Sequence, residues 1–236
     1  MRTVHKVLPK LSWDERLTYE QHCWQNGSTR VAGLDEAGRG PLAGPVVAAV
    51  FLITPDFSLP GLNDSKQLTA LQRQRFYQVL TSGAWEYATG LVEPGEIDRI
   101  NIYQASRIAM SKALQSLKVR PDFLLVDALV IPDTSVKQQA IIHGDALSVA
   151  IAAASVIAKV TRDKLMEEYD RIYPGYGFAQ HKGYPTAAHY EALQKLGPSP
   201  IHRLSFRLTK APREDSLELF ETEGDMTVED QHLKSV

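Results

Sequence analysis

The sequence predicts a mixed α/β fold built around a single sheet. Its first half contains three short strand-like segments, of which residues 46–53 are rich in β-branched residues, and its second half alternates helical and strand-like patterns. This order is typical of helices packed on the faces of one sheet. The chain of 236 residues is long enough for one large domain with a substantial core.

Each strand is expected where a short apolar run meets turn residues or a strand-ending carboxylate. The expected strands are residues 29–34, 46–53, 85–92, 123–126 and 139–142. The first two flank a turn at residues 38–41, which suggests a hairpin-like pair. Helices are expected where apolar residues recur at helical spacing, over 69–80, 101–117 and 146–173.

Composition divides the chain into three parts. Residues 1–28 mix a few large apolar residues with polar ones, which is consistent with an N-terminal arm or a short helix. Residues 29–210 carry the periodic structure of a single domain. Residues 211–236 contain eight Asp and Glu against two Lys and Arg, which indicates a solvated or disordered acidic tail.

Charge and cysteine content exclude several classes of protein. The net charge of -2 averages the acidic tail with a body that has 24 Lys and Arg against 20 Asp and Glu, so a nucleic-acid partner is not excluded. The single cysteine, Cys23, excludes an internal disulfide and a cysteine-based zinc site. No signal peptide or membrane-spanning run is expected, and a soluble cytoplasmic protein without a membrane partner is predicted.

Four acidic residues stand at the ends of apolar strands or at the start of a helix. Asp35 and Glu36 follow the first strand, Asp127 follows the fourth, and Asp145 precedes the Ala-rich helix. Taken singly, Asp145 is as well explained as a helix cap and Asp127 as a turn residue. Taken together, they would be partly desolvated carboxylates that need a compensating charge.

The strands that bear Asp35 and Asp127 would bring these two side chains together if they are parallel neighbours, about 4.8 Å apart. Asp145 would then arrive at the same edge from the helix start. Several ionised carboxylates cannot share such a place without a neutralising cation. The oxygen-only donor set favours Mg²⁺ or Mn²⁺.

Glycines, cations and an aromatic residue surround the carboxylates in sequence. Gly38-Arg39-Gly40 forms a turn beside Glu36, and it is either a plain β-turn or a place of close backbone approach to a ligand. Tyr184 lies in a glycine-punctuated loop, where it either stacks on a base or sugar or covers the core edge. The polar side chains expected to hold phosphate are Arg39, Lys66, Ser155, Lys159, Arg162 and Lys182.

Several motifs, in register and in order, closely resemble the bacterial ribonuclease HII family. They are VAGLDEAGRGPLAGP at residues 31–45, NDSK at 63–66, GD at 144–145, IAAASVIAKVTRD at 151–163, HKGY at 181–184 and GPSPIHRLSF at 197–206. The resemblance covers residues 29–207. It implies an RNase H-like mixed five-stranded sheet flanked by helices, with a helical C-terminal extension.

The resemblance also implies an activity and a set of site residues. The activity is endonucleolytic hydrolysis of RNA in RNA/DNA hybrids, including incision 5′ of a single ribonucleotide in duplex DNA, which leaves 3′-hydroxyl and 5′-phosphate ends. Two Mg²⁺ or Mn²⁺ ions would be held by the catalytic residues Asp35, Glu36, Asp127 and Asp145. Substrate would be bound by Gly38, Arg39, Gly40, Lys66, Ser155, Lys159 and Tyr184.

At three positions the assignment of the family's residue roles to this sequence needs comment. Asp163 lies 18 positions beyond Asp145, about five helical turns away, and is assigned either to structure or to the residues that support the metal ligands. Asp127 is followed by Ala128 and Tyr184 by Pro185, where the family usually has glycine. Both departures concern loop geometry and leave the functional side chains in place.

Two other functions remain open from sequence. One is a DNA recombinase or integrase-type nuclease with a similar carboxylate cluster, and the other is a non-catalytic nucleic-acid binding module. The tail segment 216–220 (SLELF) resembles a short sliding-clamp docking peptide without its leading Gln, although a chance amphipathic match explains it as well. A monomer is expected.

Overall fold

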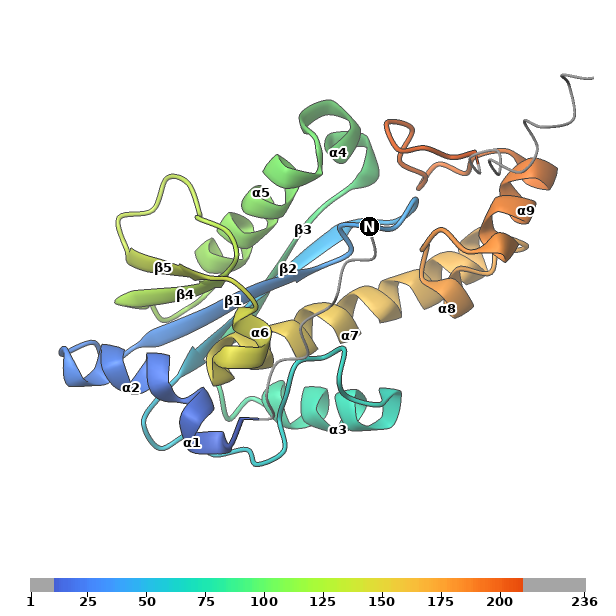
Figure 1. The fold of residues 1–236 in the computed structure, drawn as a ribbon. Helices are drawn as coiled ribbons and strands as arrows, with labels where there is room; N and C mark the ends of the chain where they lie inside the picture. The colour runs from blue at the N-terminus through green and yellow to red at the C-terminus, as the bar shows by residue number, and fades with distance from the viewer. Residues whose placement is uncertain (1–10, 210–236) are drawn as a thin grey trace, which may run out of the picture.

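A computed structural model describes residues 11–209 and shows a five-stranded mixed sheet (Figure 1). The strands are β1 (Val31–Ala37), β2 (Val46–Ile53), β3 (Tyr87–Val92), β4 (Phe123–Asp127) and β5 (Lys137–Ile141), in the spatial order β3-β2-β1-β4-β5. Strand β2 runs antiparallel to β1 and β3, whereas β1, β4 and β5 are parallel. The predicted mixed sheet and the hairpin formed by its first two strands are therefore confirmed.

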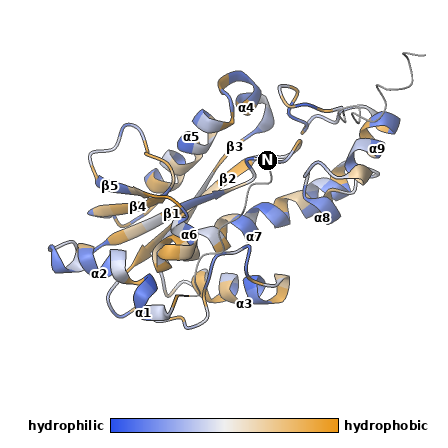
Figure 2. Cartoon of the chain, viewed as in Figure 1, coloured by the Kyte–Doolittle hydropathy of each residue, from blue (hydrophilic) through white to orange (hydrophobic). Residues whose placement is uncertain are grey.

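Helices cover both faces of the sheet. The long helix α7 (Val149–Ile172) packs with α3 (Ala70–Leu80) on one face, and α5 (Ile102–Gln115) packs with α4 (Pro94–Ile100) on the other (Figure 1). Each interface encloses its own apolar cluster, and β2 contributes buried residues to both of them. Strand β2 is accordingly largely hydrophobic along its whole length (Figure 2).

Shorter helices lie at the two ends of the described chain. Helices α1 (Trp13–Arg16) and α2 (Thr18–Gln25) precede the first strand. Helices α8 (Phe178–His181) and α9 (Ala187–Leu196) pack near the C-terminal end of α7 around a third apolar cluster that includes Met166 and Phe178 (Figure 1). None of the helices within residues 11–209 combines the length and apolar character needed to cross a membrane. The predicted acidic tail, with its segment 216–220, lies outside the described residues.

The prediction of a single helix over 146–173 is wrong, because the helical conformation is interrupted at Ser148. Residues 144–147 form the short helix α6 (Gly144–Leu147), Ser148 is extended (φ -126°, ψ 132°), and α7 starts at the next residue. The Ser148 hydroxyl accepts a hydrogen bond from the Ile151 N–H and donates one to Glu20 Oε1 at 2.6 Å. Glu20 lies 128 residues away in the sequence, so no local pattern reveals the break.

Helix α4 was also missed at the sequence level. Pro94 is expected to end a strand, and it does so, but it also occupies the first turn of α4. Proline is favoured there because its missing N–H has no helical partner to lose. Asn101 then separates α4 from α5 with a left-handed φ of 69° and caps α5 by accepting from the Gln104 N–H.

Gly33 sets the distance between the sheet and the long helix. A β-carbon at this position would lie 2.1 Å from the carbonyl carbon of Ala150 and 2.4 Å from the Ile151 nitrogen. Only glycine leaves room for this approach of the two backbones. The close packing holds the first turns of α7 directly against β1, two residues before Asp35.

Candidate functional site

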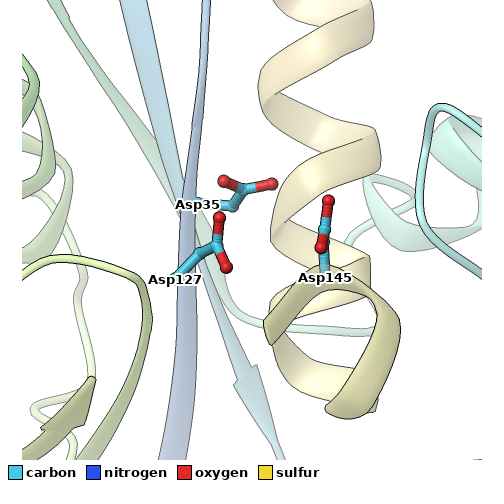
Figure 3. A group of neighbouring side chains, drawn as sticks. All are labelled: Asp35, Asp127 and Asp145. Atoms are coloured by element: carbon cyan, nitrogen blue, oxygen red, sulfur yellow. The ribbon is translucent and has the colours of Figure 1, made fainter. Parts of the chain in front are cut away.

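Three aspartates from distant parts of the chain converge at one edge of the sheet. Carboxylate oxygens of Asp35, Asp127 and Asp145 lie within 4.8 Å of one another (Figure 3). Leu34 pairs with Val126 across the parallel strands β1 and β4, so Asp35 and Asp127 follow side by side. Asp145 comes from the first turn of α6. The structure thus places these three side chains where the strand pattern predicts a metal site.

Burial and neighbouring charges raise the pKa of two of these carboxylates, Asp35 and Asp127. Burial, followed by the neighbouring charges of Glu36 and Asp127, holds the pKa of Asp35 well above its ordinary value. Burial and the charge of Asp145 also raise the pKa of Asp127, although the Gly144 N–H donates to Asp127 Oδ1 at 2.7 Å and acts against them. Bringing all these groups to the ionised state requires a nearby positive charge.

Lys66 supplies one positive charge to the cluster. Its Nζ donates to Asp145 Oδ2 at 2.8 Å, and the Asp145 side chain is only 7% exposed. Burial acts to lower the pKa of Lys66, but its hydrogen bond with Asp145 and the surrounding carboxylates outweigh burial and raise it. A single ammonium group cannot neutralise three carboxylates, so the cluster retains excess negative charge.

Glu36 lies beside the three-aspartate cluster without belonging to it. Its Oε1 accepts from Arg39 Nη1 at 3.3 Å, while its Oε2 is buried and has no hydrogen-bond partner among the described residues. Burial raises the pKa of Glu36 to about 7. A buried oxygen without a donor, next to crowded carboxylates, is satisfied by a divalent cation with oxygen ligands. The residues present therefore fit Mg²⁺ or Mn²⁺.

A pocket of about 310 Å³ opens beside the cluster. Of the sequence-predicted site residues, all but Asp145, Arg162 and Lys182 line it: Asp35, Glu36, Gly38, Arg39, Gly40, Lys66, Asp127, Ser155, Lys159 and Tyr184. Ala37 and Ser65 complete the lining. Motifs that lie far apart along the sequence thus meet around one cavity.

Two of the predicted phosphate-binding side chains are held by neighbouring residues. Ser155 is 3% exposed, and its hydroxyl lies 2.8 Å from the hydroxyl of Ser65. Lys159 Nζ donates to Asp163 Oδ1 at 2.6 Å within the same helix face. Asp163 is therefore an ion-pair partner and lies outside the aspartate cluster.

The glycine turn and Tyr184 lie beside each other in the lining of the pocket. A β-carbon on Gly40 would lie 3.8 Å from Tyr184 Cε1, and the Tyr184 side chain is 42% exposed. Gly38 has φ of +99°, and a β-carbon there would lie 2.1 Å from Arg162 Nε. Glycine is required at Gly38 both by its backbone conformation and by the space available.

The expectation that Arg162 and Lys182 face phosphate is wrong. Arg162 is 1% exposed, and its guanidinium donates to the carbonyls of Pro45, Ala43 and Lys182, each at 3.0 Å. Lys182 Nζ pairs with Glu167 at 2.7 Å. The hydrogen-bonding groups of Arg162 are thus already occupied by backbone carbonyls, and Lys182 is occupied by a carboxylate. Only the packing of the folded chain reveals these partners.

Sequence reasoning missed two further buried arginines. Arg203 donates to the carbonyls of Gly38, Arg39 and Gly44, at 2.6 to 3.1 Å, and so holds the glycine turn. Arg16 donates to the carbonyls of Leu62, Asp145 and Ala146, and so ties α1 to two segments at the carboxylate cluster. Their acceptors lie far away in sequence, so no local signal reveals them.

Comparison with known proteins identifies the family. A family model described as ribonuclease HII matches residues 32–209. The chain belongs to this family. The ribonuclease HII of Desulfitobacterium hafniense strain Y51 is 54% identical over 203 residues, which cover 86% of this chain and 76% of that protein. The ribonuclease HII of Clostridioides difficile strain 630 is 50% identical over 188 residues, covering 80% and 74%.

Solved structures agree with this ribonuclease HII assignment. The ribonuclease H2 of Pyrococcus horikoshii OT3 has a TM-score of 0.64 and 32% identity, over 76% of this chain and 94% of that one. Bst-RNase HIII, solved in complex with Mn²⁺, has a TM-score of 0.58 at 18% identity, over 79% and 70%, and it shows the fold alone. The chain is an RNase H-type nuclease with the RNase H-like sheet, and metal dependence is general in its family.

Proposed function

We propose that this ribonuclease HII incises duplex DNA on the 5′ side of a single embedded ribonucleotide, in addition to hydrolysing the RNA strand of RNA/DNA hybrids. The products would carry 3′-hydroxyl and 5′-phosphate ends. The observation that supports this most directly is the juxtaposition, in one pocket, of a buried carboxylate cluster with the neighbouring pair Gly40 and Tyr184.

We assign metal binding to four carboxylates. Asp35, Asp127 and Asp145 already lie within 4.8 Å of one another, and Glu36 offers its free buried oxygen beside them. When two Mg²⁺ or Mn²⁺ ions are bound, they supply a water of lowered pKa and charge stabilisation at the leaving 3′-oxygen.

The cations of the pocket would hold the scissile phosphate. Lys66 reaches the cluster through Asp145, while its side chain is largely exposed and so remains accessible to a phosphate. Lys159 is oriented by Asp163, and Ser155 is oriented by Ser65. Each of these side chains is held in place by a protein partner, which reduces the entropy lost when a phosphate binds.

Recognition of the ribose would come from another part of the pocket lining. The turn at Gly38, Arg39 and Gly40 lines the pocket, and its two glycines carry no side chain that would keep a ligand away from the backbone. The half-exposed ring of Tyr184 lies beside this turn. A 2′-hydroxyl between the turn and the ring is the group that distinguishes a ribonucleotide from its DNA neighbours.

A cleavage assay tests the proposal against its alternatives. Three labelled duplexes would be compared, one with a single ribonucleotide, one an RNA/DNA hybrid and one all DNA, each with Mg²⁺, Mn²⁺ or a chelator. We expect cleavage of the first two only, and only with metal. Cleavage of all-DNA duplex would favour the recombinase-type nuclease, and binding without cleavage of any duplex would favour the non-catalytic module.

Two substitutions assign the roles within the site. Asp127→Asn should abolish cleavage while leaving the protein folded, and substantial residual turnover would contradict the metal assignment. Tyr184→Ala should impair incision at a single ribonucleotide, and wild-type incision there would exclude its role in recognition. The control is Glu191→Gln, an exposed change on α9 away from the pocket.

The partner and assembly predictions lie beyond the described residues. We propose that segment 216–220 docks on the sliding clamp; an RNase HII from Archaeoglobus fulgidus, which shares the fold at 24% identity, was solved in complex with PCNA. Loss of clamp binding after deletion of residues 211–236 would support this, and unchanged binding would exclude it. The monomeric state and the cytoplasmic location stay predictions.

A further inference from the structure

Three neighbouring histidines, two of them buried, form a cluster that contacts the backbone of Tyr184. His189 on α9 is fully buried and His202 is 3% exposed, while His181 ends α8. The His181 and His189 rings stack with their centroids 4.4 Å apart, and the Nε2 atoms of His189 and His202 lie 3.0 Å apart. None of these histidines lines the pocket, so the proposed reaction leaves the cluster unused.

Backbone groups determine which ring nitrogen carries each proton. The Ser199 N–H points at His202 Nδ1 at 2.8 Å, so Nδ1 accepts and the His202 proton lies on Nε2. That proton is donated to His189 Nε2, which places the His189 proton on Nδ1. The remaining His189 N–H then donates to the carbonyl oxygen of Tyr184 at 3.0 Å. The result is a one-way chain from the Ser199 backbone to the Tyr184 backbone.

The chain requires both His189 and His202 to be neutral. Protonation of His189 would set two N–H groups against each other at 3.0 Å, and protonation of His202 would set its Nδ1–H against the Ser199 N–H at 2.8 Å. Burial, followed by the neighbouring His189, lowers the pKa of His202 to about 4, and burial also lowers the pKa of His189. The groups that face the His189 and His202 rings are Tyr176, Phe178 and His181, and none of them offers a carboxylate that would stabilise a charged imidazole.

The segment 199–203 is connected to both the glycine turn and Tyr184. Through His202 and His189 it reaches the Tyr184 carbonyl, and through Arg203 it holds the carbonyls of Gly38 and Arg39. One short segment of chain, residues 199–203, therefore supports both the glycine turn and Tyr184, whose ring lies close to Gly40.

We propose that His189 and His202 are positioning residues, which hold Tyr184 at a set distance from Gly40 and so determine how tightly the pocket accepts a ribonucleotide. This rests on the proposed role of Tyr184. The histidines act through the Tyr184 backbone and do not touch substrate.

Nuclear magnetic resonance tests the proton arrangement directly. Long-range ¹H–¹⁵N spectra of protein labelled at histidine distinguish an Nδ1–H ring from an Nε2–H ring. We expect His189 to show the Nδ1–H form and His202 the Nε2–H form, both unchanged between pH 6 and pH 8. Rings that exchange between the two forms, or that titrate in this range, would overturn the proposal.

Substitution at His189 tests the consequence for substrate. His189→Phe keeps a ring against Phe178 and removes the donor to Tyr184, whereas His189→Asn places an amide N–H near the position of Nδ1. We expect His189→Phe to raise KM for the single-ribonucleotide duplex about tenfold, the scale of one lost hydrogen bond, with kcat within about twofold. His189→Asn should recover most of the loss, and Mn²⁺ binding measured by calorimetry should be unchanged in both variants.

Controls separate positioning from stability and from the proposed function. Leu193→Ala removes a buried side chain one turn along α9 and should lower the melting temperature without changing KM. If His189→Phe changes KM no more than Leu193→Ala does, the positioning role is overturned. The double variant with Tyr184→Ala should be no worse than Tyr184→Ala alone. If Tyr184→Ala is itself fully active, the proposed function fails, and that outcome is distinct from a failure of the histidine chain.

Discussion

Replacing Glu36 by Gln should stabilise the metal-free protein at neutral and alkaline pH, even though it removes a proposed metal ligand. The Glu36 side chain is 7% exposed. One of its carboxyl oxygens pairs with Arg39, and the other has no hydrogen-bond donor among the described residues. Its ionised form is therefore poorly accommodated unless a cation is present. Gln has nearly the same shape and carries no charge to accommodate.

The expected size of this effect follows from the pKa of Glu36. Burial raises this pKa from 4.5 to about 7. One pKa unit corresponds to about 1.4 kcal/mol, so ionised Glu36 is about 3 kcal/mol less favourable in the fold than in the unfolded chain. Below pH 4.5 the group is protonated in both states and contributes no penalty.

Between pH 4.5 and pH 7 the unfolded chain releases this proton while the folded chain keeps it. The folded state then binds more protons, so its stability falls as the pH rises, and the full penalty is present above pH 7. The Glu36→Gln variant has no such dependence at this position. The stability difference between variant and parent should therefore grow by about 3 kcal/mol from acidic to alkaline pH.

This difference can be measured by urea unfolding at pH 5 and at pH 8, with a chelator present. The matched control is Glu191→Gln, on the surface of α9. We expect an unchanged m-value and a higher midpoint for Glu36→Gln at pH 8. Adding Mn²⁺ should reverse the order, because only the parent retains the full ligand set. A difference that is equal at the two pH values, or a parent that is more stable at pH 8 without metal, would refute the reasoning.

Two further substitutions test how the site is supported. Gly33→Ala should destabilise the protein by about 1–3 kcal/mol or more, since the new methyl group would lie 2.1 Å from the Ala150 carbonyl carbon; a melting temperature equal to that of the parent would contradict the close approach of β1 and α7. Arg16→Met should lower stability by about 2–4 kcal/mol, because buried carbonyls at Asp145 and Ala146 lose their donor. It should also weaken Mn²⁺ binding in calorimetry, and binding equal to that of an Arg30→Met control would exclude this support of Asp145.

Much of the sheet and of the candidate site could be predicted because the signals are local. A β-branched run such as residues 46–53 predicts a buried strand whatever its tertiary partners are. An acidic residue directly after an apolar run is likewise recognisable from the sequence alone. The edge strand β5 was predicted two residues late, because its exposed start at Lys137 and Gln138 is polar. An edge strand buries only one side, so its hydrophobic pattern is weak.

The sequence by itself determined which residues are the candidates for the chemistry, namely the carboxylates that end β1 and β4 and the acid that precedes the Ala-rich helix. Only the tertiary structure decided how they are held: the break at Ser148 made by Glu20, the arginines turned to carbonyls, and the histidine chain that contacts the Tyr184 backbone. These contacts join residues that lie as many as 165 positions apart, as Arg203 and Gly38 do. Whether such a contact forms, and how much it contributes to stability, depends on the position of its partner in space, and no local sequence pattern encodes that position.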